Sequence, residues 1–452
     1  MPEKVTNVLG LIRKSLSFKL LFLGGLLLIL LIPIGILGLL RESRADRAAN
    51  VEREIGSKWG GVMHVESPLL IASLETEKQT KDGKTELEKM PFFIVPEDLQ
   101  AECTLTPEIR HRGIYQAVLY KGTVHLKGSF RLPEEQWKKR GKILLDDLRL
   151  ACAFSNAKAV KIQSAKLQDQ ELLPRRGDSF WRYSKDFYLP AKEELSLHHG
   201  DTVSFDITME LKGTRRFLIE PIAKSNEIVI KSSWPHPCFM GSALPDQRDI
   251  SDNGFEANWS FENQDADAAP AYSLISHDTD FLHSLNRIKL EGTIPGNTIG
   301  AELLLPVDKY LQVERVQKYS FLVVAIILIA FLIGERLTGI WVHPLQYLFI
   351  GASLVTFYLL LLALSEHLLF GLSYLLSVLV TTGMVTAYSR AIFARKRFSA
   401  LILGGIMLLA YGLVYLVIGL EDFALLFGTF VVLLLLGILM AFTRKLNADA
   451  KE

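Results

Sequence analysis

Six long runs of apolar residues dominate the pattern of this chain, one near its beginning and five in its last third, with a long polar stretch between them. The runs cover residues 18–40, 319–334, 344–364, 368–389, 398–418 and 423–442. No ionised side chain lies in the middle of any run, and each approaches or reaches the roughly 20 residues that an α-helix needs to cross a membrane. The pattern therefore predicts six transmembrane helices.

The first run could be either a retained helix or a cleaved signal peptide. Its apolar stretch exceeds the roughly 7 to 15 residues of a typical signal-peptide core. Leu39, Leu40 and Arg41 at its end do not form the small-x-small pattern of a cleavage site. Both observations favour a retained membrane anchor.

Basic residues flank the predicted helices unevenly and predict the orientation. Four of them precede the first helix: Lys4, Arg13, Lys14 and Lys19. The positive-inside rule therefore places residues 1–40 with their N-terminus in the cytoplasm. The loops on the same side hold further basic residues, whereas the two short outer loops hold none. Both termini, including a tail at 443–452, are predicted to be cytoplasmic, and the polar region to lie outside.

The polar region, residues 41–318, has the composition of a soluble domain with strand patterns. Val203, Phe205, Ile207, Met209 and Leu211 alternate with polar residues, as in a strand with one buried face. We expect a hairpin turn at residues 121–122, an exposed loop at 75–88 and a short helix at 307–318. No strand-to-helix alternation typical of parallel sheets appears.

The predicted fold class is therefore a mixed membrane protein. It combines a six-span α-helical bundle, whose last five helices occupy residues 319–442, with a large antiparallel β-sandwich-like domain. The net charge of +1 averages the two parts and indicates no nucleic-acid partner. Cys103, Cys152 and Cys238 all lie in the polar domain and allow at most one disulfide.

Motifs for catalysis or cofactor binding are missing from the sequence. It contains no phosphate-binding Gly-rich loop with Lys, no nucleophile elbow and no zinc-protease helix. His236 and Cys238 are a possible metal pair, but two ligands with a Pro between them are too few for a site. We predict a rigid turn at Trp234, Pro235, His236 and Pro237, with no catalytic, cofactor or metal residue, and no enzymatic activity.

A second group of candidate residues lies at the outer ends of the later helices. Glu366, His367, Glu421 and Asp422 are predicted to form a small cluster that could hold a cation or serve as a pH sensor. The alternative is ordinary polarity of short turns at a membrane surface. Glu335 and Arg336, on the inner side, are interpreted as an interfacial ion pair.

Three blocks of sequence resemble the CreD-type inner-membrane protein family. The first begins with Trp-Pro-His-Pro at 234–237 and continues to Trp259. The second runs from Pro306 to Tyr319. The third includes His343-Pro344, Ser365-Glu366-His367 and Leu420-Glu421-Asp422. The resemblance covers essentially the whole chain and implies a Gram-negative inner membrane, a periplasmic domain, and a link to envelope stress and colicin tolerance. It implies no established reaction.

Two functions follow as hypotheses. The first is a non-enzymatic role in cell-envelope integrity, in which the periplasmic domain binds an envelope component or partner while the helices hold it at the lipid bilayer. The alternative is a flippase-like conduit for a lipid or hydrophobic solute among the five C-terminal helices. The sequence does not specify the ligand, the transported molecule or the oligomeric state.

Overall fold

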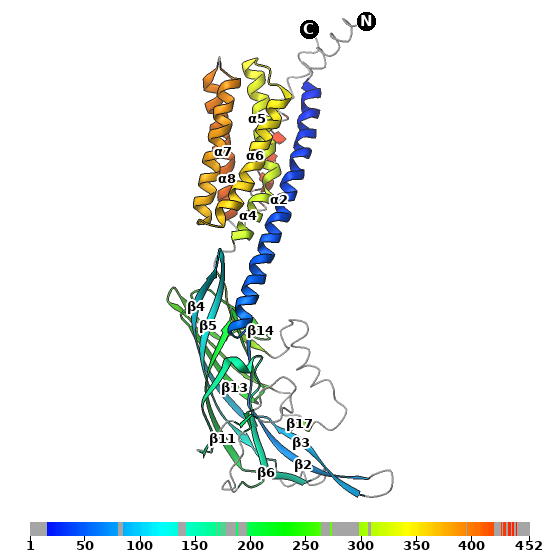
Figure 1. The fold of residues 1–452 in the computed structure, drawn as a ribbon, viewed down its shortest axis with the longest axis vertical. Helices are drawn as coiled ribbons and strands as arrows, with labels where there is room; N and C mark the ends of the chain where they lie inside the picture. Colours follow the sequence, from blue (N-terminus) through cyan, green and yellow to red (C-terminus); the bar gives the residue numbers. More distant parts are fainter. Residues whose placement is uncertain are drawn as a thin grey trace. The chain divides into compact units, whose positions relative to one another are not determined.

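The computed structural model divides into two compact units (Figure 1). One comprises residues 1–48 and 307–452 and is helical, and the other comprises residues 49–306 and is rich in strands. The structure describes residues 16–79, 85–133, 142–168, 170–172, 175–176, 187–188, 197–263, 272–273, 298–305, 309–394 and 396–419, with scattered positions between 426 and 440.

The described helices lie close to the predicted positions, and most of them are long and apolar. They are α2 (Leu16–Trp59), α4 (Lys309–Lys318), α5 (Ser320–Thr338), α6 (Pro344–Ser365), α7 (Phe370–Ile392) and α8 (Arg397–Gly419). Five of them, all except the short α4, are long and apolar enough to span a membrane. The predicted sixth span, residues 423–442, lies largely outside the described residues, so the structure supports five spans.

Helix α2 continues well past the predicted end of its apolar run at residue 40. Its polar part is rich in Glu, Arg and Ala, which favour helix, and Glu54 pairs with Lys58 one turn later at 3.0 Å. The helix ends at two glycines, where Gly61 has a φ of 73° and donates its N–H to the Gly56 carbonyl. Helix propensity beyond the membrane span therefore explains the added length.

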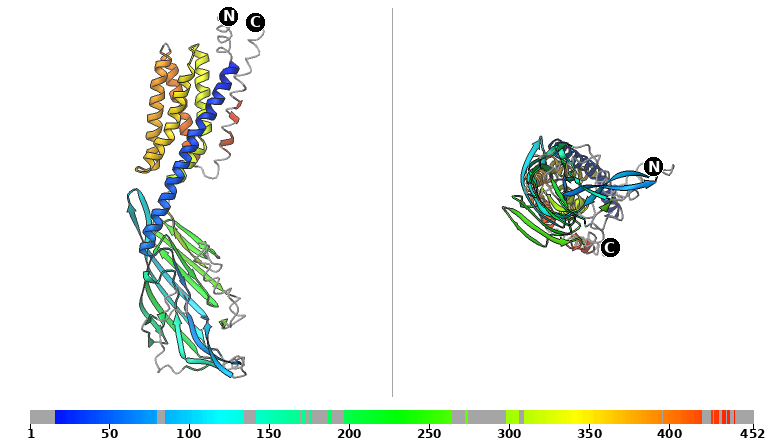
Figure 2. Two further views of the ribbon diagram at one scale, coloured as in Figure 1. Left: turned by 45° about the vertical axis from the view of Figure 1, so that its right-hand side comes forward. Right: turned by 90° about the horizontal axis from the view of Figure 1, so that it is seen from below.

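In the helical unit, neighbouring helices run side by side, and α6 packs on α7, α7 on α8 and α8 on α5 (Figures 1 and 2). Buried side chains from α2 and α4 to α8 form one apolar core. At Gly351 a Cβ would lie 2.3 Å from Leu30 Cδ1, so α2 and α6 approach each other closely there. Val313 and Val316 of α4 are buried, which confirms the predicted short helix and its apolar face.

The strand-rich unit contains three main sheets and a two-stranded ribbon. Its strands are β1 (Met63–Glu66), β2 (Leu69–Gln79), β3 (Thr85–Ile94), β4 (Asp98–Arg112), β5 (Tyr115–Arg131), β6 (Lys142–Ala151), β7 (Val160–Leu167), β8 (Gln170–Glu171), β9 (Arg175–Arg176), β10 (Phe187–Tyr188), β11 (Thr202–Thr214), β12 (Arg216–Glu220), β13 (Ser225–Ser232), β14 (Pro237–Gly241), β15 (Gln247–Ser251), β16 (Gly254–Glu262), β17 (Tyr272–Ser273) and β18 (Ile299–Leu303). The strand orders are β15-β16-β13-β4-β5-β11-β7-β8, β17-β3-β2-β6, β1-β12-β18-β14 and β10-β9.

One apolar core joins the three main sheets. The predicted buried face of residues 203–211 is confirmed, because the apolar residues of β11 all belong to this core. The predicted antiparallel arrangement holds for most strand pairs, but β1 pairs with β12 and β4 with β13 in parallel. Each parallel pair joins segments that are far apart in the sequence. A local strand-to-helix pattern therefore could not predict either pair.

Two local predictions in this unit are wrong. The hairpin turn expected at Lys121 and Gly122 is the middle of β5, which pairs without interruption with both β4 and β11. A Cβ at Gly122 would lie 2.7 Å from Leu211 Cδ1, so the glycine serves close packing and not a turn. The expected loop at 75–88 is largely strand, with Glu75 opposite Lys89 in the β2–β3 hairpin; residues 80–84 lie outside the described residues.

Candidate functional site

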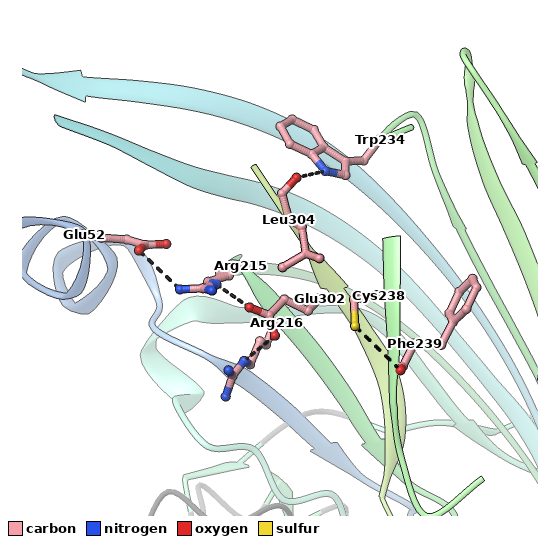
Figure 3. Close-up of polar contacts among 8 residues, drawn as sticks. All are labelled: Glu52, Arg215, Arg216, Trp234, Cys238, Phe239, Glu302 and Leu304. Carbon is pink, nitrogen blue, oxygen red and sulfur yellow. Dashed lines mark hydrogen bonds and ion pairs between the residues drawn. The ribbon is translucent and has the colours of Figure 1, made fainter. Parts of the chain in front are cut away.

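The Trp-Pro-His-Pro turn, residues 234–237, fixes the start of β14 against β18. Trp234 is buried, and its indole Nε1 donates to the Leu304 carbonyl at 2.8 Å (Figure 3). The Leu304 N–H donates in turn to the His236 carbonyl at 3.2 Å. Phe239 then packs edge-on against Phe255 and Trp259. Trp234 and Phe239 therefore pack into the sheets, as expected for the aromatic residues of this turn.

The β14–β15 segment, residues 237–251, follows this turn and supplies an end strand to each of two sheets. Strand β14 ends the four-stranded sheet that begins with β1, and β15 ends the eight-stranded sheet, as far as the described residues show. All residues of β15 are exposed. Strands at the end of a sheet present unpaired backbone groups that a partner can engage. The segment is therefore a candidate binding surface.

The loop between β14 and β15 is held rigidly while its apolar residue faces outward. The Trp259 indole donates to the Ala243 carbonyl at 3.2 Å, and Asp246 Oδ2 accepts from the Ser260 N–H at 2.7 Å. Leu244, between these two anchors, is 71% exposed. A fixed and exposed apolar residue lowers the entropic cost of binding.

Beside β14 a network of charges surrounds Glu302 of β18. The Glu302 carboxylate is 5% exposed and accepts hydrogen bonds from Arg215 Nε and from Arg216 Nε, the second at 3.0 Å (Figure 3). Arg215 Nη1 also lies 3.4 Å from Glu52 Oε2 of α2. Because two guanidinium groups share one buried carboxylate, the buried charge is fully compensated.

Cys238 and His236, the possible metal pair, are both exposed and on either side of a proline. Neither belongs to a group of His, Cys, Asp or Glu side chains close enough to hold a metal among the described residues. Cys238 pairs in register with Glu302. None of the three cysteines forms a disulfide, and Cys103 and Cys152 are buried. Burial raises the pKa of the Cys103 thiol above its usual range.

The described residues do contain one group with metal-ligand chemistry, which sequence reasoning missed: His64, Glu66 and Glu220. His64 and Glu66 lie two residues apart on one face of β1, and Glu66 faces Glu220 across the parallel pair with β12. Their ligand atoms lie within 4.8 Å of one another. In the sequence, only the His-x-Glu pattern of residues 64–66 could have indicated this group. That pattern is weak evidence for a metal site, because the third residue, Glu220, is distant in the chain.

Burial controls the charges of this group. Desolvation lowers the pKa of His64 to about 4 and raises the pKa of Glu220 to about 7. His64 Nε2 and Glu220 Oε2 are 3.6 Å apart. Both atoms are buried without a hydrogen-bond partner.

Among the predicted cluster at the outer helix ends, Glu366 follows α6 and contacts groups from other helices of the helical unit. Its Oε2 lies 3.6 Å from Arg44 Nη1, and its Oε1 accepts from the Tyr310 hydroxyl at 3.3 Å. His367 is the next residue, in the same turn. Glu421 and Asp422 lie outside the described residues, so their place in the cluster stays a prediction.

Glu335 lies in the last turn of α5, where it is buried and pairs with Lys19 of α2. The sequence had predicted an interfacial pair with Arg336 instead. The Tyr347 hydroxyl donates to Glu335 Oε2 at 2.9 Å. A cavity of about 200 Å³ lies beside these groups. Its lining is mostly apolar and comprises Phe18, Lys19, Phe22, Leu23, Leu332, Trp341, Val342, His343, Pro344 and Tyr347.

Apolar helices long enough to cross a membrane, joined in one chain to a large sheet-rich domain, define a multi-span membrane protein with a polar domain. Residues 15–449 match the family model described as "Inner membrane protein CreD". The chain belongs to the CreD family of inner membrane proteins. It is 29% identical over 454 residues to the inner membrane protein CreD of Escherichia coli (strain K12), covering 97% of this chain and 94% of that protein.

Proposed function

We propose that this protein maintains the cell envelope without catalysis, from the inner membrane of a Gram-negative cell. In this proposal the helices anchor the chain with both termini in the cytoplasm. The sheet-rich domain faces the periplasm and binds an envelope component. The uneven distribution of basic residues supports this orientation.

The β14–β15 segment is the observation that carries the binding role. It offers two end strands and an exposed, rigidly held Leu244, while Arg248 and Asp249 of β15 add exposed charges of both signs. Such a surface suits a polypeptide that adds a strand to an existing sheet. We therefore propose that the envelope component is a protein bound along this segment.

A complementation experiment tests this function. Cells lacking the gene receive the wild-type protein, Leu244→Asp or Arg248→Glu, and uptake of a hydrophobic fluorescent probe and survival in colicin are measured. We expect both variants to fail to restore the wild-type envelope although they reach wild-type levels in the membrane. Ile109→Asp is the matched control, since Ile109 is also exposed but lies on β4.

Full restoration by both variants would exclude the β14–β15 segment as the working surface. A deletion strain with normal probe uptake and normal colicin survival would contradict the envelope role itself. Hydrolysis of an envelope component by the purified protein would contradict a role without catalysis.

The cavity in the helical unit favours a second candidate function, lipid handling. Its walls are mostly apolar, and the Lys19 ammonium among the lining residues is paired with Glu335. An acyl chain matches this apolar lining. The cavity supports lipid binding within the unit.

Liposomes distinguish binding from transport. Purified protein in vesicles with fluorescent phosphatidylglycerol should be tested for lipid movement between leaflets, with Leu332→Trp as the variant that fills the cavity. Lipid movement that Leu332→Trp abolishes would support a conduit. Equal movement in protein-free vesicles would contradict it.

A further inference from the structure

We propose that His64, Glu66 and Glu220 form a binding site for a divalent transition-metal ion in the sheet-rich unit. One imidazole and two carboxylates are a ligand set that Zn²⁺ and similar ions accept. Ca²⁺ and Mg²⁺ prefer oxygen ligands alone, so the histidine selects against them. The site lies at β1 and β12, on different strands from the β14–β15 segment.

The first observation that points to a ligand is the unsatisfied histidine. His64 is 5% exposed, and its Nε2 has no hydrogen-bond partner. Glu220 Oε2 is likewise buried and unpartnered, at 3.6 Å from that nitrogen and so beyond hydrogen-bond distance. Leaving buried polar atoms unpaired is costly, and a metal ion between them would satisfy both.

The spacing of the ligand atoms also fits a metal. Tetrahedral Zn²⁺ with bonds near 2.1 Å separates its ligands by about 3.4 Å. The His64 to Glu220 distance of 3.6 Å already matches this value. The ligand atoms of the three residues lie within 4.8 Å of one another. A change in the side-chain torsions of the half-buried Glu66 is enough to move its carboxylate to bonding distance from the same ion.

The backbone around the three ligands is fixed, which makes the site preorganised. Ser155 binds His64 from both sides: its Oγ accepts from the His64 N–H at 3.0 Å, and its N–H donates to the His64 carbonyl at 3.0 Å. The Glu220 carbonyl accepts from the N–H and the hydroxyl of Ser67, at 3.0 and 2.8 Å. Three protein ligands leave a fourth position for water or for a group from a partner.

Metal binding can be measured on the full-length protein in detergent, purified without a polyhistidine tag and stripped with a chelator. Titration with Zn²⁺ should show one equivalent bound per chain, and Co²⁺ in its place should give the visible absorption of a tetrahedral site. We expect His64→Ala and Glu220→Gln to bind Zn²⁺ at least about tenfold more weakly. Glu220→Gln keeps the size of the side chain, so it serves if His64→Ala fails to fold.

The matched control is His125→Ala. His125 forms another histidine–carboxylate pair in the same unit, with its Nε2 2.9 Å from Asp206 Oδ1, but its side chain is partly exposed. This variant should bind one equivalent of Zn²⁺ as tightly as the wild type. Failure of the wild-type protein to bind, or equal affinity in Glu220→Gln, would overturn the proposal. Both outcomes are independent of the envelope phenotype.

Discussion

Arg215 binds the buried carboxylate of Glu302 through its guanidinium Nε while its own backbone has a φ of 60°. A positive φ is unfavourable for a side chain of this size, so surrounding contacts must hold it there. The Arg215 N–H donates to the Val118 carbonyl at 3.0 Å, and its carbonyl accepts from the Leu303 N–H at 2.8 Å. Strands β5 and β18 therefore position the guanidinium between Glu302 and Glu52.

This arrangement predicts that removing the two arginines and removing the Glu302 charge lower the free energy of unfolding by different amounts. The double variant Arg215→Ala with Arg216→Ala leaves Glu302 charged and buried, so the free energy of unfolding should fall by about 3–5 kcal/mol. Glu302→Gln should cost less, because the two arginine side chains are 43% and 37% exposed and remain hydrated. Chemical unfolding of the full-length protein in detergent measures both. A larger loss in Glu302→Gln would contradict the account.

Two glycines of β5 give a second, matched test. A Cβ at Gly128 would lie 2.1 Å from the Asp98 carbonyl oxygen, which is backbone, whereas at Gly122 it would meet the movable end of Leu211. Overpacking typically costs about 1–3 kcal/mol. Gly128→Ala should therefore lower the free energy of unfolding by about 3 kcal/mol and Gly122→Ala by about 1. Equal losses, measured by the same unfolding, would show that β5 does not approach β4 as closely as the structure indicates.

The helical unit should lose stability in acid through Glu314. Hydrogen bonds from Arg41 and Lys318 lower the pKa of Glu314 below its usual value of 4.5. A lowered pKa means that the unfolded chain takes up the proton first, so the stabilisation is complete above pH 4.5 and is lost as the pH falls below it. Thermal unfolding in detergent at pH 6 and pH 3.5 should therefore show a smaller acid-induced loss for Glu314→Gln than for the wild type. An equal acid-induced loss of stability in the variant and the wild type would show that Glu314 does not cause the acid sensitivity.

The sequence predicted the helices well because hydropathy and helical periodicity are local properties. The turn at Trp234 was predicted for a similar reason, since two prolines restrict the backbone there. The tertiary partners were not predictable in this way. Arg44 comes to Glu366, and Lys19 to Glu335, from a helix more than 300 positions earlier in the chain.

The same limit applies to the sheets. Gly122 is a turn signal by composition, but its role depends on Leu211 from another strand. Glu66 and Glu220 meet only because β1 and β12 pair in parallel, and neither strand alone shows that register. The group of His64, Glu66 and Glu220 was therefore not predictable from the sequence, whereas His236 and Cys238 lie close together in the chain and form a local pattern.

Labelling of Cys238 tests the proposed periplasmic location of the sheet-rich domain. Cys238 is exposed, whereas Cys103 and Cys152 are buried, so only Cys238 should react in the folded protein. In cells with a permeabilised outer membrane and an intact inner membrane, a membrane-impermeant maleimide should label the wild-type protein and not Cys238→Ser. Labelling that requires lysis of the inner membrane would place the domain in the cytoplasm and contradict the account.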